Sequence, residues 1–115
     1  MSKVDDLLPL APASLHILLS LAGGEPLHGY GIMQEILRQS EGKYKLGPGT
    51  MYDNLQRLMK QGLVDEVEGS KEDNSRRRCY RLSSFGQKLL SAEISRLEGV
   101  LKEARLRRVP RRGRA

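Results

Sequence analysis

The sequence has few of the residues that stabilise small secreted domains or span membranes. Its 115 residues include no tryptophan, one phenylalanine and one cysteine. A single cysteine excludes an intramolecular disulfide and fits a reducing compartment. No stretch approaches the roughly 20 consecutive apolar residues of a membrane-spanning helix, and residues 1–6 carry acids where a signal peptide carries basic residues. We therefore expect a cytoplasmic protein with no membrane partner.

The residue clusters that enzymes need are also missing. His16 and His28 have no metal-ligand spacing with Cys79. The sequence has no Gly-rich phosphate loop, paired-carboxylate motif or nucleophile elbow. For His28, which precedes Gly29 and Tyr30, we expect a packing or helix-capping role and not that of a general base. We predict a protein that is not an enzyme and that needs no cofactor or metal.

Basic residues exceed acidic ones by six, but the excess lies at one end of the chain. The last eleven residues contain six arginines: Arg105, Arg107, Arg108, Arg111, Arg112 and Arg114. The other 14 basic residues balance the 14 acidic ones. The arrangement of charges, and not their total, must therefore indicate any nucleic-acid surface. Residues 109–115, rich in Arg, Pro and Gly, cannot form a core and are predicted to be a disordered basic tail.

Three helical patterns precede a pair of short β patterns. The helices are predicted at residues 13–22, between Leu27 and Ser40, and from Pro48 to a stop at Gly62. A short extended piece, 43–46, joins the second to the third. The β patterns cover 63–68 and 77–82 and flank a polar stretch, as in a hairpin. With a long helix after them, these elements have the order of a winged helix-turn-helix over residues 11–83.

The last helix is predicted over residues 84–108. Ser84-x-x-Gln87 forms a capping-box pattern at its start, with Ser83 as the alternative cap. Along it, apolar residues recur at heptad spacing: Leu90, Ile94, Leu97, Leu101 and Ala104. So narrow a seam requires a partner helix, so we predict a dimerisation helix. The expected fold class is mainly α with a small β-hairpin.

The third helix is the candidate for reading DNA. At about 100° per residue, Met51, Leu55 and Leu58 share one face, which we expect to face the core. The opposite face is predicted to hold Gly49, Thr50, Asp53, Gln56, Arg57 and Lys60. Side chains of these types contact base edges or phosphates in a major groove. An ordinary solvated helix face is the alternative.

Basic residues flank this helix on both sides. Lys43 and Lys45 precede it, and Arg76, Arg77, Arg78 and Arg81 lie on the returning strand of the hairpin, where a wing would reach phosphates. The hairpin also carries acids, at Glu66, Glu68, Glu72 and Asp73. These acids could restrict phosphate contact to the arginine strand.

Four motifs resemble the PadR regulators in order and spacing. They are His28-Gly29-Tyr30-Gly31-Ile32, Gly47-Pro48-Gly49-Thr50-Met51-Tyr52 with Leu55-x-Arg57-Leu58, Gly62-Leu63-Val64, and Arg78-Cys79-Tyr80-Arg81-Leu82-Ser83-x-x-Gly86. The resemblance covers roughly residues 12–104. It implies a winged-helix homodimer that represses genes, often for detoxification or multidrug efflux, with Tyr52 beside Gly49 and Thr50 in the groove-reading helix. The short form of the family has one C-terminal helix, as here.

The predicted sites follow from the patterns and the resemblance together. The candidate DNA-binding residues are Lys43, Lys45, Gly49, Thr50, Tyr52, Gln56, Arg57, Lys60, Arg76, Arg77 and Arg78. The expected partners are double-stranded DNA, as a pseudopalindromic operator, and a second copy of the chain. The alternative is a winged-helix module that binds an acidic protein and has no DNA sequence specificity. Binding of RNA or a membrane surface by the Arg-rich tail is disfavoured, because that tail lacks aromatics and an apolar face.

Three departures from the family pattern limit what the resemblance implies. Gly47 replaces the usual Ser, which removes a side-chain cap. Asp53 stands where Pro is frequent and places a carboxylate beside the DNA. Family members that bind planar drugs at the dimer interface use an aromatic on the last helix, and this chain has none after Phe85. Drug binding of that kind is not expected, and another small-molecule effector stays open.

Overall fold

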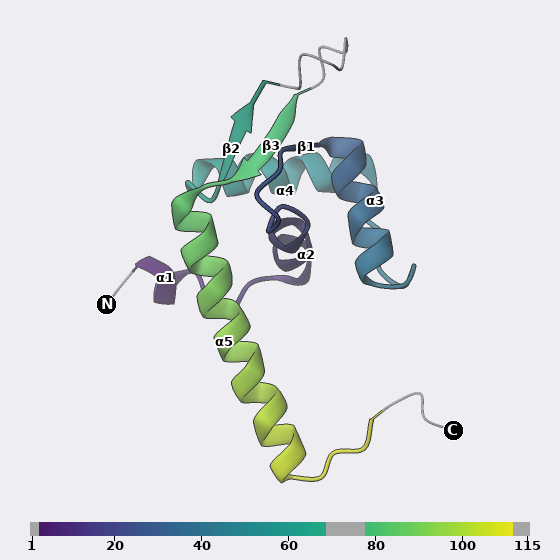
Figure 1. Cartoon of the computed structure of the whole chain (residues 1–115), viewed down its shortest axis with the longest axis vertical. Coiled ribbons are helices and arrows are strands. Elements are labelled where there is room, and N and C mark those ends of the chain that lie inside the picture. The colour runs from purple at the N-terminus through teal and green to yellow at the C-terminus, as the bar shows by residue number, and fades with distance from the viewer. Residues whose placement is uncertain (1–2, 69–77, 112–115) are drawn as a thin grey trace.

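The structure is a computed structural model that describes residues 3–68 and 78–111 (Figure 1). Its elements are α1 (Lys3–Asp6), α2 (Pro12–Ser20), β1 (Leu27–His28), α3 (Gly29–Gln39), α4 (Pro48–Lys60), β2 (Val64–Val67), β3 (Cys79–Leu82) and α5 (Ser84–Leu106). Helices α2, α3 and α4 pack together below the strands, and α5 extends well beyond them. The predicted mainly α winged-helix architecture is confirmed.

Two short elements lie outside the sequence prediction. α1 has four residues and β1 has two, which is too short for a periodic pattern. β1 pairs antiparallel with β3, so that Leu27 lies opposite Tyr80 and His28 opposite Cys79. The strand order is β1-β3-β2. The predicted hairpin is therefore part of a three-stranded sheet with β3 at its centre, and the polar stretch 69–75 lies outside the described residues.

Helix starts depend on the residues that cap them. The Nδ1 atom of His28 accepts a hydrogen bond from the Gly31 backbone N–H at 3.0 Å, which confirms the capping role predicted for this histidine. For α5 the cap is the alternative residue Ser83. Its hydroxyl accepts from the Gly86 N–H at 2.9 Å and donates to the Gly62 carbonyl at 2.6 Å. The capping box on Ser84 is therefore wrong.

Two predicted helix ends are also corrected. α2 ends at Ser20 and not at residue 22, because the chain turns there toward Gly24, which has a φ of 86°. α5 ends at Leu106 and not at residue 108, since Arg108 adopts a φ of 56° and stops the helix. The predicted stop at Gly62 is confirmed, with a φ of 77° just past α4.

The core is formed by aliphatic side chains of α2, α3, α4 and the start of α5. Its fully buried members are Ile17, Leu18, Leu21, Ile32, Ile36, Met51, Leu55, Leu63 and Leu89. Gly86 is essential to the packing of α5, because a Cβ there would lie 2.1 Å from the Leu63 carbonyl oxygen. This close approach holds the first turns of α5 against the three-helix core.

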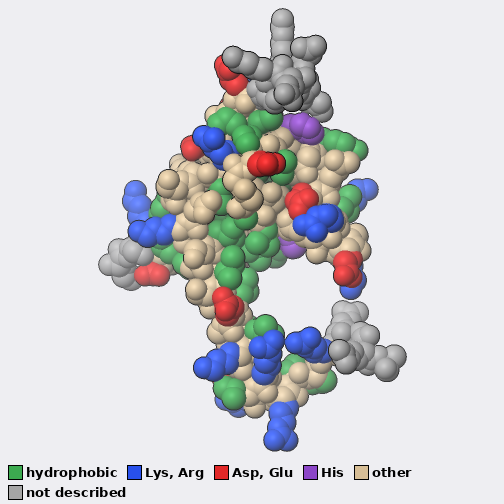
Figure 2. All heavy atoms as spheres, viewed as in Figure 1, with side chains coloured by type: hydrophobic (Ala, Val, Ile, Leu, Met, Phe, Trp, Pro, Cys, Tyr) green, Lys and Arg blue, Asp and Glu red, His purple; other side chains and the backbone are tan. Residues whose placement is uncertain are grey.

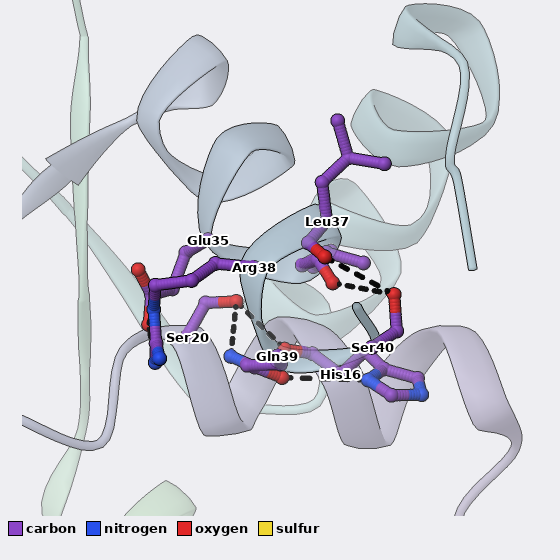
Figure 3. Close-up of polar contacts among 8 residues, drawn as sticks. His16, Ser20, Glu35, Leu37, Arg38, Gln39 and Ser40 are labelled. Atoms are coloured by element: carbon purple, nitrogen blue, oxygen red, sulfur yellow. Dashed lines mark hydrogen bonds and ion pairs between the residues drawn. The ribbon is translucent and has the colours of Figure 1, made fainter. Parts of the chain in front are cut away.

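A polar network fastens α2 to the end of α3 (Figure 3). The Gln39 amide donates to the Ser20 hydroxyl at 3.1 Å, and its oxygen lies 3.4 Å from Nδ1 of His16. The His16 ring stacks on Tyr44, with centroids 4.6 Å apart. Ser40 continues the network, because its hydroxyl accepts from the Tyr44 N–H at 2.9 Å. These contacts fix the loop that leads into α4.

A buried carboxylate joins the N-terminal segment to α5. Glu93 has no exposed surface. Its carboxylate accepts from the Leu10 backbone N–H at 2.8 Å and from Nε and Nη2 of Arg96 at 2.5 and 3.1 Å. The hydrogen bond from Arg96, and secondarily that from Leu10, lowers the pKa of Glu93 in spite of burial. Sequence analysis did not identify this contact.

Candidate nucleic-acid interface

Helix α4 presents the two faces that its sequence predicts. Met51, Leu55 and Leu58 are buried, and the residues predicted to face outward are all exposed: Gly49, Thr50, Asp53, Gln56, Arg57 and Lys60. Asn54 was not anticipated as a buried polar residue, and its amide donates to the Thr50 carbonyl at 2.8 Å. This bond satisfies the buried Asn54 amide within α4 itself, so it takes no partner from the outer face.

The outer face of α4 divides into a centre and two flanks. At about 100° per residue, Asp53 and Gln56 lie near its middle, opposite the buried stripe. Thr50 and Arg57 fall on one flank, and Tyr52 falls on the other. The candidate DNA-binding residues of α4 are therefore not equivalent, because the two flanks face different surroundings.

A surface cavity of about 330 Å³ lies on the Tyr52 flank, between α4, β3 and the start of α3. Its lining residues are His28, Gly29, Tyr30, Tyr52, Leu55, Gln56, Met59, Arg78 and Tyr80. Burial, and secondarily the neighbouring Tyr52 phenol, raises the pKa of Tyr80. Tyr80 therefore keeps its proton at neutral pH. No local sequence pattern brings these residues together, since they come from β1, α3, α4 and the β3 segment.

Gly29 gives the Tyr52 ring its position at this cavity. A Cβ on Gly29 would lie 2.2 Å from the Tyr52 Oη and 2.7 Å from its Cζ. Only a residue without a side chain therefore permits the phenol to pack against the first turn of α3. Even so, Tyr52 keeps 44% of its surface exposed. The glycine of the His-Gly-Tyr motif thus has a steric explanation.

In the described part of the wing, one of the two arginines is paired with an acid. Nε of Arg78 lies 3.0 Å from Oε1 of Glu66, on the neighbouring strand. The hairpin acids were expected to restrict phosphate contact to the arginine strand, and here one of them pairs with an arginine at the start of that strand. Arg81 is exposed on β3. The other two predicted wing arginines, Arg76 and Arg77, lie outside the described residues.

The loop before α4 places two of the predicted basic residues in solvent. Lys43 and Lys45 are exposed, and Tyr44 between them is half-buried against His16. The stacked Tyr44 ring and the Ser40 bonds hold this loop, so the lysines project from an ordered segment. Arg57 and Lys60 are exposed on α4 itself.

Comparison with known families agrees with this arrangement. The Transcriptional regulator PadR-like family matches residues 17–92, more than half of the chain. The chain belongs to the PadR family of transcriptional regulators. The resemblance seen in the four sequence motifs is thereby confirmed. A family of regulators also fits the expectation that the protein is not an enzyme.

Relatives of this PadR-family chain extend the match to most of its length. It is 36% identical over 93 residues to the transcriptional regulator Rv3488 of Mycobacterium tuberculosis, which covers 81% of this chain and 82% of the relative. A PadR family regulator from Clostridium difficile is 21% identical, with a TM-score of 0.71 over 84% of this chain and 97% of that one. A PadR-like regulator from Bacillus cereus is 16% identical, with a TM-score of 0.72 over 94% and 97%. The two structures support the fold.

The predicted dimerisation seam is only partly exposed in this PadR-family chain. Leu90 is buried in the core of its own chain, which corrects its assignment to the seam. Ile94 and Leu101 expose 40% and 46% of their surface, while Leu97 and Ala104 are half-buried. The exposed part of the seam therefore begins at Ile94, four residues later than predicted, where α5 leaves the core.

Basic side chains surround the far end of α5 (Figure 2). The exposed basic residues there are Lys102, Arg105, Arg107, Arg108 and Arg111. One of them, Arg107, pairs with Glu103 at 3.0 Å. Residues 112–115 of the predicted tail lie outside the described residues. Among the described residues, this basic group at the end of α5 is separate from the exposed residues of α4.

Other kinds of site find no support among the described residues. In residues 3–68 and 78–111, no three His, Cys, Asp or Glu side chains gather to hold a metal ion. Within the same ranges no helix is long and apolar enough to cross a membrane.

Proposed function

We propose that this PadR-family protein is a sequence-specific repressor that binds a pseudopalindromic operator in double-stranded DNA as a homodimer. The observation that carries the proposal is the exposed polar face of α4, held outward by the buried stripe opposite. In this arrangement α4 enters the major groove, where Thr50 and Gln56 contact base edges. Arg57 and Lys60 contact phosphates from the same helix.

The proposed homodimer forms through α5. A seam of exposed aliphatic side chains on an isolated helix is unfavourable in water, and a second copy of the same helix covers it. A two-fold dimer presents two α4 helices to one face of the DNA. The half-sites of its operator then lie about 34 to 36 Å apart, or a multiple of this spacing.

Selection of bound duplexes from a random pool tests the proposal. We expect an inverted repeat, with binding that weakens steeply as the salt concentration rises. The rival function is a winged-helix module that binds an acidic protein, which the exposed Arg57 and Lys60 of the same helix could contact. Recovery of unrelated sequences with a shallow salt dependence would support the rival.

Two variants separate base reading from phosphate contact. Gln56→Ala should relax sequence preference, because a good base contact supplies about 1–3 kcal/mol of discrimination. Lys45→Ala should weaken operator and scrambled duplex alike and reduce the salt slope by about one unit. Titrations on both duplexes at several salt concentrations give the comparison. A change of preference in Lys45→Ala, with none in Gln56→Ala, would reverse these roles.

A further inference from the structure

The cavity beside Tyr52 is lined by hydrogen-bond donors from three elements. Tyr52, which is exposed, and Tyr80, which is buried apart from a small exposed part, both line it. His28 also lines it, and because its Nδ1 accepts from the Gly31 N–H, the proton of the neutral ring is on Nε2, which is therefore a donor. Arg78 adds a guanidinium. The geometry thus groups neutral and cationic donors around one space.

Carboxylates are absent from the described lining of this cavity. Glu66 is not part of the lining, but it pairs with Nε of Arg78 and thereby orients the Arg78 guanidinium. Neutral tyrosine donors with one oriented arginine suit an oxyanion, because each can donate to a charged oxygen. A cation would find no acidic ligand among these residues.

The position of the cavity indicates which oxyanion it takes. A helix in the major groove has a phosphate backbone on each side, and the wing lies over one of them. The cavity occupies the flank of α4 that faces β3, while Thr50 and Arg57 occupy the other flank. We infer that this cavity is the seat of one backbone phosphodiester of the bound DNA in each half-site. The inference rests on the proposed DNA-binding function, and it assigns a backbone phosphate as the group that binds at this part of the surface.

Gly29 is the positioning residue of this seat. It makes no side-chain contact with DNA, but its missing Cβ lets the Tyr52 phenol reach the cavity. The volume of about 330 Å³ admits a phosphate with part of its deoxyribose. Gly29 leaves room for the Tyr52 ring, and the Tyr52 hydroxyl donates to the phosphate, so both residues affect binding of the same phosphate.

The test uses the selected duplex, with each phosphate replaced in turn by an uncharged methylphosphonate. Wild-type protein should lose affinity roughly ten-fold at the phosphate held in this cavity, as expected for a hydrogen bond to a charged group, in addition to losses at the phosphates that Arg57, Lys60 and Lys45 contact. Tyr52→Phe should bind the unmodified duplex roughly ten-fold more weakly and lose less than wild type does at that phosphate, because Arg78 and the other donors still contact it. Tyr80→Phe should behave in the same way. Tyr44→Phe is the matched control, since Tyr44 lies against His16 and not in the cavity.

Gly29→Ala is examined in the same scan, with circular dichroism to establish that it folds. It should lose the coupling at the same phosphate while keeping the wild-type response at all others, which a general loss of structure would not produce. A double variant that combines Gly29→Ala with a smaller residue in place of Tyr52 has no phenol at the cavity. If this double variant regained the coupling to the phosphate, the assignment would be contradicted.

The remaining outcomes are distinct. If wild-type protein binds the duplex but no phosphate has a smaller effect in Tyr52→Phe than in wild type, the seat is overturned and the proposed function stands. A second outcome is that millimolar inorganic phosphate displaces the DNA at constant ionic strength while Tyr52→Phe changes the effect of no methylphosphonate. That outcome assigns the cavity to a free anion and also overturns the inference. A wild-type protein that binds no duplex overturns the proposed function and the seat together.

Discussion

Replacing Glu93 with Gln tests the buried contact between the N-terminal segment and α5. The substitution preserves shape but removes the charge that the Leu10 N–H and Arg96 share. A hydrogen bond to a charged buried group is worth about 1.5–3 kcal/mol. Arg96 keeps access to water and can be solvated, so we expect a loss at the lower end, about 1.5 kcal/mol. For a domain of this size that lowers the melting temperature by roughly 5 to 10 °C.

The loss should depend on pH in a definite direction. Because the folded protein lowers the pKa of Glu93, the ionised carboxylate stabilises the fold above its unfolded pKa of about 4.3. This stabilisation disappears as the pH falls through the lower, folded pKa. The glutamine side chain of the variant does not titrate in this range. The difference between wild type and Glu93→Gln should therefore be constant from about pH 5 to 7 and shrink toward acid.

Glu103→Gln is the matched control for this measurement. Glu103 also pairs with an arginine on α5, Arg107, but both side chains are exposed, so the substitution should cost no more than a few tenths of a kcal/mol. Thermal unfolding at fixed protein concentration, followed by circular dichroism from about pH 3 to 7, compares the three proteins. Equal small effects of the two substitutions, or a Glu93→Gln deficit that persists at the acid end, would refute the account of the buried pair.

Three further predictions concern packing, assembly and the tail. Gly86→Ala should cost about 2 kcal/mol or more in chemical denaturation, because its Cβ would meet the rigid Leu63 carbonyl, whereas Gly99→Ala, with open space around it, should be neutral or stabilising. Replacing Leu97 and Leu101 together with Asp should give a monomer in sedimentation, and a mass that stays dimeric would place the interface elsewhere. Deleting residues 109–115 should lower affinity for specific and non-specific duplex alike, and a loss confined to the operator would contradict an auxiliary electrostatic role.

Sequence periodicity was sufficient for the large elements and for α4. Met51, Leu55 and Leu58 recur at helical spacing, so their burial and the exposure of the opposite face followed directly from the helical period of about 3.6 residues. The same rule placed the seam of α5, but it could not tell that Leu90 belongs to the core. Periodicity identifies a face, and only packing decides how much of that face its own chain covers.

Local chemistry also determined the helix starts to within one residue. A histidine before Gly29 and a serine before the last helix each offer an acceptor to an unpaired N–H, and both cap a helix. Which of two adjacent serines does so depended on the Gly62 carbonyl, to which only Ser83 donates. That partner lies 21 residues earlier in the chain, so no local pattern could select it.

Contacts between distant segments were decided by the tertiary structure alone. The sequence determined the winged-helix order, the polar outer face of α4 and the excess of arginine at the end of the chain. It could not show that Gly29 accommodates the Tyr52 ring, that Glu66 pairs with Arg78, or that Glu93 accepts from Leu10. Each of these contacts joins residues on different elements, and their distances follow from how the elements pack and not from their spacing along the chain.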